Sequence, residues 1–326
     1  MQKTRKIKLP AAAIVALSFL VLIFLGTALL CIPAATKSGE VNFLTSLFTA
    51  TSAACVTGLI TVDVFTHFSG FGQAIILVLI QIGGLGFITI LSLFLLYVKK
   101  HTSLTQRKLV MQSAGSVDLG SVKSLVLIIL IGTAIFEVVG AFALSFAFVP
   151  VYGWGLGIWQ AIFTAISAFC NAGFTLTGAN GTNSLCGFVG NPLVMITVML
   201  LIVIGGLGFF VWGDVVHHGV HVRKYSFHAK IVLSATAALI IVPWALFMAF
   251  EWNGAALDGK GAGTKVLATL FMAVTPRTAG FASIEYADMT SAGKVLTNVL
   301  MFIGGSPGST AGGIKTTTVA VFVLSM

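Results

Sequence analysis

The chain has 326 residues, of which 57% are hydrophobic and 8% are charged, and its mean hydropathy is +1.05. A chain of this composition cannot stay soluble, so it is predicted to be an integral membrane protein. The formal net charge of +9 is attributed to membrane orientation and contact with anionic lipid, and not to binding of nucleic acid.

Six apolar runs approach or exceed the roughly 20 residues that a helix needs to cross hydrocarbon. The first is expected to be an uncleaved span, because it is longer than the apolar core of about 7 to 15 residues in a secretory signal. The predicted spans are Ala11–Ile32, Phe71–Val98, Ser124–Pro150, Pro192–Trp212, Ala229–Phe250 and Ala292 onward.

Basic residues are unevenly distributed between the loops. With a cytoplasmic amino terminus, 13 of the 18 lysines and arginines lie on the inner side, as the positive-inside rule requires. The inner set is Lys3, Arg5, Lys6, Lys8, Lys99, Lys100, Arg107, Lys108, Lys123, Arg223, Lys224, Lys230 and Lys315.

Six of the nine acidic residues are expected on the outer side, where a mildly negative mouth would concentrate cations. The favoured interpretation is that they are solvated surface charges. These residues are Glu40, Asp63, Glu251, Asp258, Glu285 and Asp288.

A short motif occurs three times, each time between two apolar runs, and such internal repeats decide the fold. A second motif follows each copy, with 25, 32 and 24 residues between the last glycine of the first motif and the first glycine of the second. The first motif reads Phe48-Thr-Ala-Thr-Ser-Ala-Ala-Cys-Val-Thr-Gly58, Phe163-Thr-Ala-Ile-Ser-Ala-Phe-Cys-Asn-Ala-Gly173 and Phe271-Met-Ala-Val-Thr-Pro-Arg-Thr-Ala-Gly280; the second reads Ile82-Gly-Gly-Leu-Gly-Phe87, Ile204-Gly-Gly-Leu-Gly-Phe209 and Ile303-Gly-Gly-Ser-Pro-Gly308.

The repeat predicts an all-α integral membrane protein whose span, pore-loop and span units are arranged pseudo-symmetrically around a pore. The units are expected at 1–100, 123–216 and 229–326, and the third ends in a broken helix. The segments 101–122 and 217–228 are expected to be cytosolic loops.

The stretch Asn42–Ala54 has a helical composition but measures only roughly 20 Å as a helix, too short to cross a bilayer. It is therefore predicted to enter the membrane and turn back, with the negative end of its dipole facing a cation pathway. Irregular backbone at that depth must be buried in protein or line a wet cavity.

Glycine is needed at the turn because inward-facing carbonyls require positive φ at some residues. A ring of such carbonyls can replace the hydration shell of an ion, and the lack of a carboxylate among them suits a monovalent ion better than Ca²⁺ or Mg²⁺. The candidate ion-binding backbone is Cys55, Val56, Thr57 and Gly58; Cys170, Asn171, Ala172 and Gly173; and Thr278, Ala279 and Gly280.

These motifs, with Met301-Phe-Ile-Gly-Gly-Ser-Pro-Gly-Ser-Thr-Ala-Gly-Gly-Ile-Lys-Thr-Thr-Thr318, resemble the membrane subunit of the Trk/Ktr potassium-uptake family, and the Ktr type in particular. The resemblance implies four units around one pore, K⁺ bound by loop carbonyls, and a glycine in each loop that accompanies preference for K⁺. It further implies a homodimer on a cytosolic ring of nucleotide-binding regulatory subunits, a bacterial plasma-membrane location, and K⁺ as the transported ion without a covalently bound cofactor.

The chain departs from that family pattern because it stops at Met326, inside the second span of the third unit. We expect a fragment in preference to a natural three-unit protein, since three quarters of a ring cannot enclose an ion. The alternative function is therefore a non-conducting fragment or a regulatory or scaffold membrane subunit.

Glycine and proline are dense in the last span and predict an unwound segment inside the bilayer. It resembles the intramembrane gate of the family; the alternative is a kink for close packing of small residues. Lys315 could oppose the passage of K⁺ or snorkel to the inner face. The candidate gate comprises Gly304, Gly305, Ser306, Pro307, Gly308, Ser309, Thr310, Gly312, Gly313 and Lys315.

Two further ionisable residues fall at membrane depth. Arg277, next to the third filter, is expected to brace the loop by donating to its carbonyls, and Glu137 needs a partner, for which Arg277 or Lys315 is conceivable. A membrane enzyme would need a cluster of nucleophile, base or metal ligands within the spans, and none is found, so the chain is not expected to be an enzyme. The histidines at 217, 218 and 221 are not expected to bind a metal.

Overall fold

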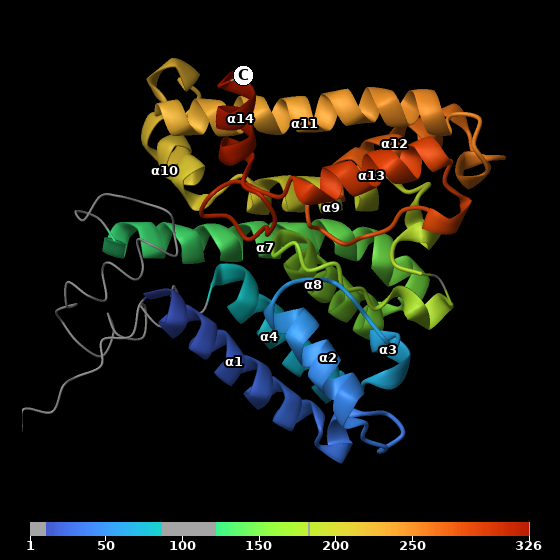
Figure 1. Ribbon diagram of the computed structural model, residues 1–326. Coiled ribbons are helices and arrows are strands. Elements are labelled where there is room, and N and C mark those ends of the chain that lie inside the picture. Colours follow the sequence, from blue (N-terminus) through green and yellow to red (C-terminus); the bar gives the residue numbers. More distant parts are fainter. Residues whose placement is uncertain (1–10, 87–121, 182, 326) are drawn as a thin grey trace, which may run out of the picture.

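The computed structural model describes residues 11–86, 122–181 and 183–325, which form helices joined by loops and short 3-10 turns (Figure 1). This agrees with the all-α class predicted from the repeat. Among these described residues, two helices, α7 (Val122–Tyr152) and α11 (Phe227–Glu251), are each long and apolar enough to cross a membrane by themselves, and one bent pair of helices could be a third span.

In the first unit, the helices α1 and α4 both pack against a shorter helix, α2. Asn42 is the N-cap of the short helix α2, because its side chain accepts hydrogen bonds from the Leu44 and Thr45 amides. Residues 87–98 of the predicted second span, the loop at 101–122 as far as residue 121, and the amino-terminal basic residues lie outside the described part of the chain. The helices are α1 (Ala11–Leu30), α2 (Phe43–Ala54), α3 (Val64–His67) and α4 (Gly70–Leu85).

The second unit corrects one prediction, because its second span is not straight. The predicted span Pro192–Trp212 divides into two helices that meet at 96°. Gly208 lies at the bend with φ +91, a conformation that glycine adopts without steric cost. The helices of this unit are α7, α8 (Trp154–Phe169), α9 (Pro192–Gly206) and α10 (Phe209–His218).

The third unit contains the broken helix that the glycine and proline density predicts. Its second span starts as a helix, becomes irregular from Gly304 to Lys315, and resumes as a helix at Thr316. Its helices are α11, α12 (Ala262–Val274), α13 (Ser291–Phe302) and α14 (Thr316–Leu324).

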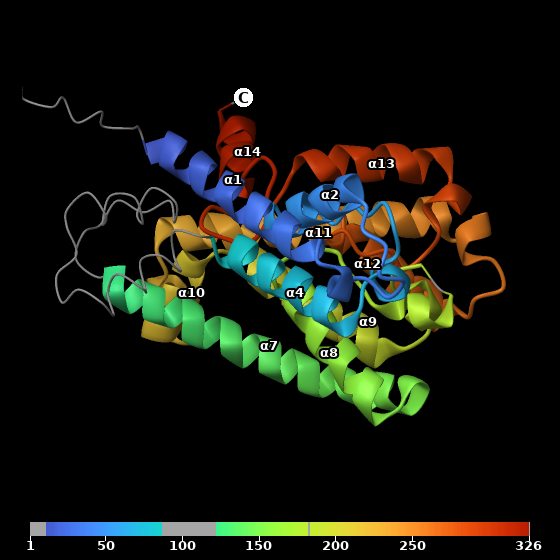
Figure 2. The ribbon, with the colours of Figure 1, turned by 90° about the horizontal axis from the view of Figure 1, so that it is seen from below.

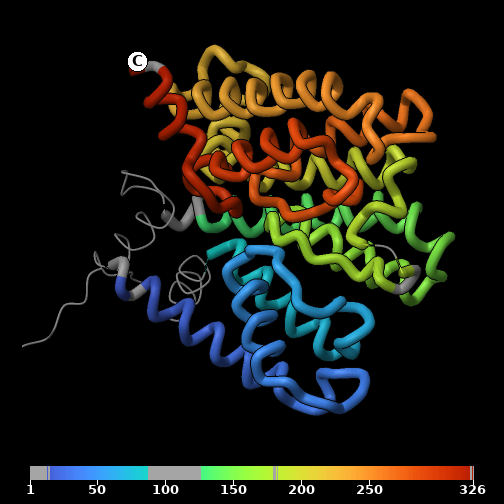
Figure 3. The backbone as a smooth tube through the Cα atoms, turned by 45° about the vertical axis from the view of Figure 1, so that its right-hand side comes forward, coloured from blue at the N-terminus to red at the C-terminus, as the bar shows by residue number. Residues whose placement is uncertain are grey.

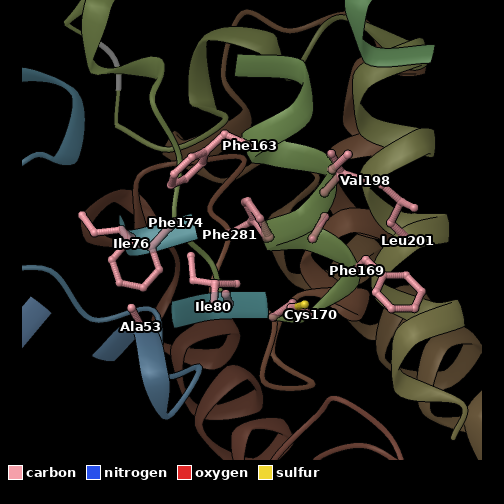
Figure 4. Packing of buried hydrophobic residues seen from close by; sticks show 14 of the residues in the cluster. Ala53, Ile76, Ile80, Phe163, Phe169, Cys170, Phe174, Val198, Leu201 and Phe281 are labelled. Carbon is pink, nitrogen blue, oxygen red and sulfur yellow. The ribbon is translucent and has the colours of Figure 1, made fainter. Parts of the chain in front are cut away.

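The three units lie side by side in chain order, as the blue, green and orange parts of Figures 1 and 3 show. Figure 2, seen from below, has the blue first unit in front. Helix α4 of the first unit contacts α8 of the second, and α9 of the second contacts α12 of the third. Buried side chains from all three units join one core, in which Figure 4 shows Ile76, Phe163, Phe174 and Phe281. This core holds the short helices α2, α8 and α12 in fixed positions, so the loops that follow them are held as well.

Candidate ion pathway

The first two short helices end with the same hydrogen bonds, which is structural evidence for the repeat. In the first unit, the Val56 amide donates to Ala53 O and the Thr57 amide to Ser52 O, at 3.3 and 2.9 Å. In the second unit, the Asn171 and Ala172 amides donate to the equivalent carbonyls at 3.1 and 2.8 Å. This is a Schellman ending, which places the residue after the C-cap in the left-handed conformation.

Left-handed residues occur at equivalent positions in all three loops. Val56, Asn171 and Thr278 have φ of 55°, 56° and 61°, and the glycine two residues later in each loop also has positive φ. Asparagine tolerates this conformation, but β-branched valine and threonine are outliers there. Such strain persists only where the surroundings impose it, and it clusters at functional sites.

The loop glycines meet at one place. A Cβ added to Gly58 would lie 2.7 Å from Ala172 O, and one added to Gly173 would lie 2.8 Å from the Cα of Gly280 and 2.9 Å from Ala279 O. Three backbone segments, each more than 100 residues from the next in sequence, therefore come together around the predicted filter glycines.

The other predicted filter residues differ in their surroundings. Cys55 and Cys170 both cap their helices, but Cys55 is exposed and Cys170 is fully buried. The Thr57 hydroxyl donates to the Ser52 hydroxyl at 3.0 Å. In the third loop the Ala279 amide donates to Thr275 O at 3.0 Å, so this loop turns by a different route from the other two.

Glycines of the second motif contact the ends of the helices that precede the loops, and this contact was not predicted from the sequence. A Cβ at Gly83 would lie 2.1 Å from Ala54 O, and one at Gly205 would lie 2.0 Å from Phe169 O. Equivalent glycines thus let α4 and α9, the helices that follow the loops, touch the last residue of α2 and α8, the helices that precede them. The repeated spacing of the two motifs was the available signal for this contact.

The predicted gate segment, Gly304–Lys315, is hydrogen-bonded into the bend of the second unit. The Ser306 amide donates to Gly206 O at 3.0 Å, and the Phe209 amide donates to Gly308 O at 2.7 Å. These bonds explain the unpredicted bend, because α9 must stop at Gly206 to leave its last carbonyls free for the segment.

The same segment is also hydrogen-bonded to two of the predicted filter loops. The Thr310 hydroxyl donates to Phe169 O at 3.0 Å and accepts from Asn171 Nδ2 at 2.8 Å. The Gly312 amide donates to Thr278 Oγ1 at 3.1 Å. Asn171 and Thr278 are the left-handed residues of the second and third loops, so the predicted gate segment contacts the predicted filter at its strained positions.

The remaining gate residues contact the segment itself or the next helix. Ser306 is fully buried and its hydroxyl lies 2.9 Å from the Thr316 hydroxyl. Ser309 donates to Ser306 O at 2.7 Å, and Lys315 Nζ donates to Ala311 O at 2.8 Å. Gly304 and Gly305 donate to Ile314 O and Gly312 O, at 3.0 and 3.2 Å, which closes the segment into a loop. Pro307 lies at the turn of this loop, and Gly313 has φ of 70°.

Arg277 does not have the hydrogen-bond partner that was predicted for it. Its side chain is buried, and Nη2 donates to the Thr236 hydroxyl of α11 at 3.4 Å, where a filter carbonyl was expected. The guanidinium therefore ties the start of the third loop to the surrounding helix. Glu137 likewise has neither Arg277 nor Lys315 as its hydrogen-bond partner; Gln81 Nε2 donates to its Oε2 at 3.2 Å.

Comparison with known proteins identifies relatives along the whole chain. The family model described as TrkH, cation transport protein, matches residues 9–326. The potassium/sodium uptake protein NtpJ of Enterococcus hirae is 44% identical over all of this chain and 71% of its own length. The Ktr system potassium uptake protein B of Bacillus subtilis is 38% identical over 96% of this chain and 69% of its own length.

One solved structure supports the fold. The potassium transporter TrkH from Vibrio parahaemolyticus matches with a TM-score of 0.69 at 18% identity, over 99% of this chain. The chain spans 63% of that protein's chain.

Proposed function

The chain belongs to the TrkH family of cation transport proteins, and on this basis we propose that it contributes the selectivity filter and gate of a K⁺ uptake pathway. It is a helical membrane transporter and not an enzyme. The observation that carries the proposal is the meeting of three loop glycines, each two residues after a left-handed residue.

Alternation of left-handed residues supports a carbonyl filter. Positive φ at Val56 and again at Gly58 turns the backbone so that its oxygens can face one axis, and the other two loops have the same alternation. The carboxyl ends of α2 and α8 add partial negative charge close to these oxygens. A site of neutral oxygens holds a monovalent cation weakly enough to release it.

The segment Gly304–Lys315 is proposed to be the gate. It is irregular backbone within the predicted last span, and polar groups within it contact two of the predicted filter loops. Opening would require these bonds to break, and a net cost of about 0.5–1.5 kcal/mol for each is small enough for a regulatory signal to supply.

Assembly is proposed from the family and from the names of the relatives. We infer a homodimer in the plasma membrane of a bacterium, with a cytoplasmic amino terminus, contact with anionic lipid, and a separate cytosolic nucleotide-binding subunit. The Ktr system relatives are named as parts of a system, which supports the separate subunit. Uptake measured with and without that subunit tests the inference, and equal uptake would contradict it.

The experiment that tests the function is Rb⁺ uptake and growth rescue in cells that lack K⁺ uptake, using the complete reading frame that encodes this chain. Gly58→Ser and Gly173→Ser are expected to lower the preference for K⁺ over Na⁺ by about tenfold or more, because each side chain would strain the left-handed backbone and meet a neighbouring loop.

Gly155→Ser is the matched control. Gly155 lies in the first turn of α8, has open space where a side chain would stand and has ordinary φ, so its substitution should leave ion preference unchanged. If wild-type protein reaches the membrane but takes up no Rb⁺, the proposal fails, and a scaffold or regulatory role becomes the better account.

A further inference from the structure

Glu137 is a carboxyl group inside a membrane helix without a basic hydrogen-bond partner among the described residues. It lies near the middle of α7, is partly buried, and its Oε1 atom is buried without a hydrogen bond in the described structure. An ionisable side chain in this position is costly, and it is retained mainly where it has a function. Its bonding partner, Gln81 of α4, indicates what that function is.

Gln81 joins Glu137 to the second filter loop. Its Nε2 donates to Glu137 Oε2 at 3.2 Å, and its Oε1 accepts from the Cys170 thiol at 3.8 Å. The Glu137 carboxyl oxygen accepts this bond, so the NH₂ end of the Gln81 amide is the end that faces α7. The other end, the carbonyl oxygen, is then directed at Cys170. The three side chains come from α7, α4 and the end of α8.

Cys170 has little freedom to move away from this contact. It is fully buried, and Figure 4 shows its sulfur beside α4, close to Ile80. A Cβ at Gly84 of α4 would lie 2.6 Å from its Sγ, so the helix backbone packs directly on the thiol. The next residue is the left-handed Asn171, so the position of Cys170 determines where the strained backbone begins.

This support is specific to the second loop. Gln81 precedes the glycine motif of the first unit, whereas Val203 and Phe302 precede the motif in the second and third units. Neither valine nor phenylalanine has a side-chain amide that could bond to a neighbouring loop. The repeat is therefore broken by a polar side chain where the first unit contacts the second.

We propose that Glu137 and Gln81 are positioning residues for the second filter loop, and that through Cys170 they set the preference of the filter for K⁺ over Na⁺. This inference rests on the proposed function. The pair acts by hydrogen bonding: Glu137 orients the Gln81 amide, and the amide together with Gly84 holds Cys170 in place. Neither residue contacts the ion.

The test measures ion preference by thermal stabilisation of the purified protein, which requires no transport. The ratio of the Na⁺ and K⁺ concentrations that give half-maximal stabilisation is compared between variants. Gln81→Leu and Glu137→Leu are each expected to lower this ratio by about two- to tenfold, the effect of losing one hydrogen bond. The double variant should show no further change, because both residues act through one contact.

Gln73→Leu is the matched control, on the same helix. Gln73 is buried and bonded to Phe68 O and to the Trp159 indole, so its loss destabilises the protein without touching Cys170. It should lower the melting temperature and leave the ratio unchanged. Glu137→Gln keeps a carbonyl acceptor for Gln81 and is expected to retain most of the wild-type ratio. This variant tests the role of Glu137 even if Glu137→Leu does not fold.

The inference is overturned if the Gln81 and Glu137 variants leave the ratio at its wild-type value, if Gln73→Leu shifts it equally, or if the two leucine substitutions add. Rb⁺ uptake by the same wild-type protein separates the two ideas. Preferential stabilisation by K⁺ without uptake would remove the transport proposal and leave the positioning role intact. Absence of stabilisation by either ion would remove both.

Discussion

Glu251 illustrates how a single acidic residue can be misjudged from sequence. It was expected among solvated charges at the outer mouth, yet its side chain is fully buried at the end of α11. Its Oε1 accepts from the Thr290 amide and hydroxyl at 3.1 and 2.6 Å. Thr290 caps α13, so the carboxylate stabilises the start of that helix with its negative charge near the positive end of the dipole.

Replacement of Glu251 by leucine is predicted to destabilise the protein by about 1–3 kcal/mol, because the Thr290 amide and hydroxyl lose their buried acceptor. Thermal unfolding in detergent measures this. Glu285→Leu is the control, since Glu285 is exposed and bonded to the exposed Asn183 side chain. Equal melting temperatures for the two variants would contradict the capping role.

At the scale of elements, the gate segment is a loop whose outward contacts are concentrated in a few bonds. Thr310 both donates to the end of α8 and accepts from Asn171, so it joins the segment to the second filter loop. Ser309, its neighbour, bonds only within the segment. These two residues permit a direct test of whether contact with the filter keeps the segment in place.

Thr310→Val is predicted to raise K⁺ flux several-fold, because loss of the hydroxyl leaves Asn171 Nδ2 and Phe169 O without their partner and weakens the closed arrangement by about 1–2 kcal/mol. Initial Rb⁺ uptake per molecule in the membrane is the measurement. Ser309→Ala removes a hydroxyl of the same segment and should change flux little. A Thr310→Val variant with unchanged or lower flux would show that this contact does not hold the gate closed.

The elements that could be predicted are those specified by local residues. Helix α2 begins and ends within one residue of its predicted bounds, because Asn42 caps it and the loop after it needs left-handed backbone. The unwound last span followed from proline and glycine density. The bend at Gly208 could not be predicted, since it depends on carbonyls that receive bonds from a segment about 100 residues later.

The candidate site was predictable to a similar extent. Repeats identified three loop glycines, and the structure brings those three together, while their role in a filter stays a prediction. The partners of Arg277 and Glu137 were not predictable, because Thr236 and Gln81 are single polar residues without a motif. Their significance depends on which helix faces the loop, and that is decided by packing between units.

At the scale of the whole molecule, the first two units share one close backbone contact, between the helix that precedes the loop and the helix that follows it. Gly205 of α9 lies against the last residue of α8, as Gly83 of α4 does against α2. A side chain at either position has no space, so α4 or α9 would have to move away from the loop that precedes it. The geometry of the predicted filter thus depends on glycines that lie outside it.

Gly205→Ala is predicted to destabilise the protein by about 1–3 kcal/mol and to reduce Rb⁺ uptake, because its methyl group would meet the Phe169 carbonyl at 2.0 Å. Gly213→Ala is the control: this glycine of α10 has open space where a Cβ would stand, and alanine should be neutral or slightly stabilising there. Comparable melting temperatures for the two variants would refute the role of close packing.

Gly304 occupies the position equivalent to Gly83 and Gly205, yet its backbone faces a different neighbour. A Cβ there would lie 1.8 Å from Gly312 O, a carbonyl of its own loop, whereas the other two face the end of a short helix. Glycine is thus needed in all three copies, but in two of them because of a neighbouring helix and in the third because of its own loop. Repeated units can therefore keep the same residue at equivalent positions while that residue makes different contacts in one of them. Sequence identity between repeats does not establish that their contacts are the same.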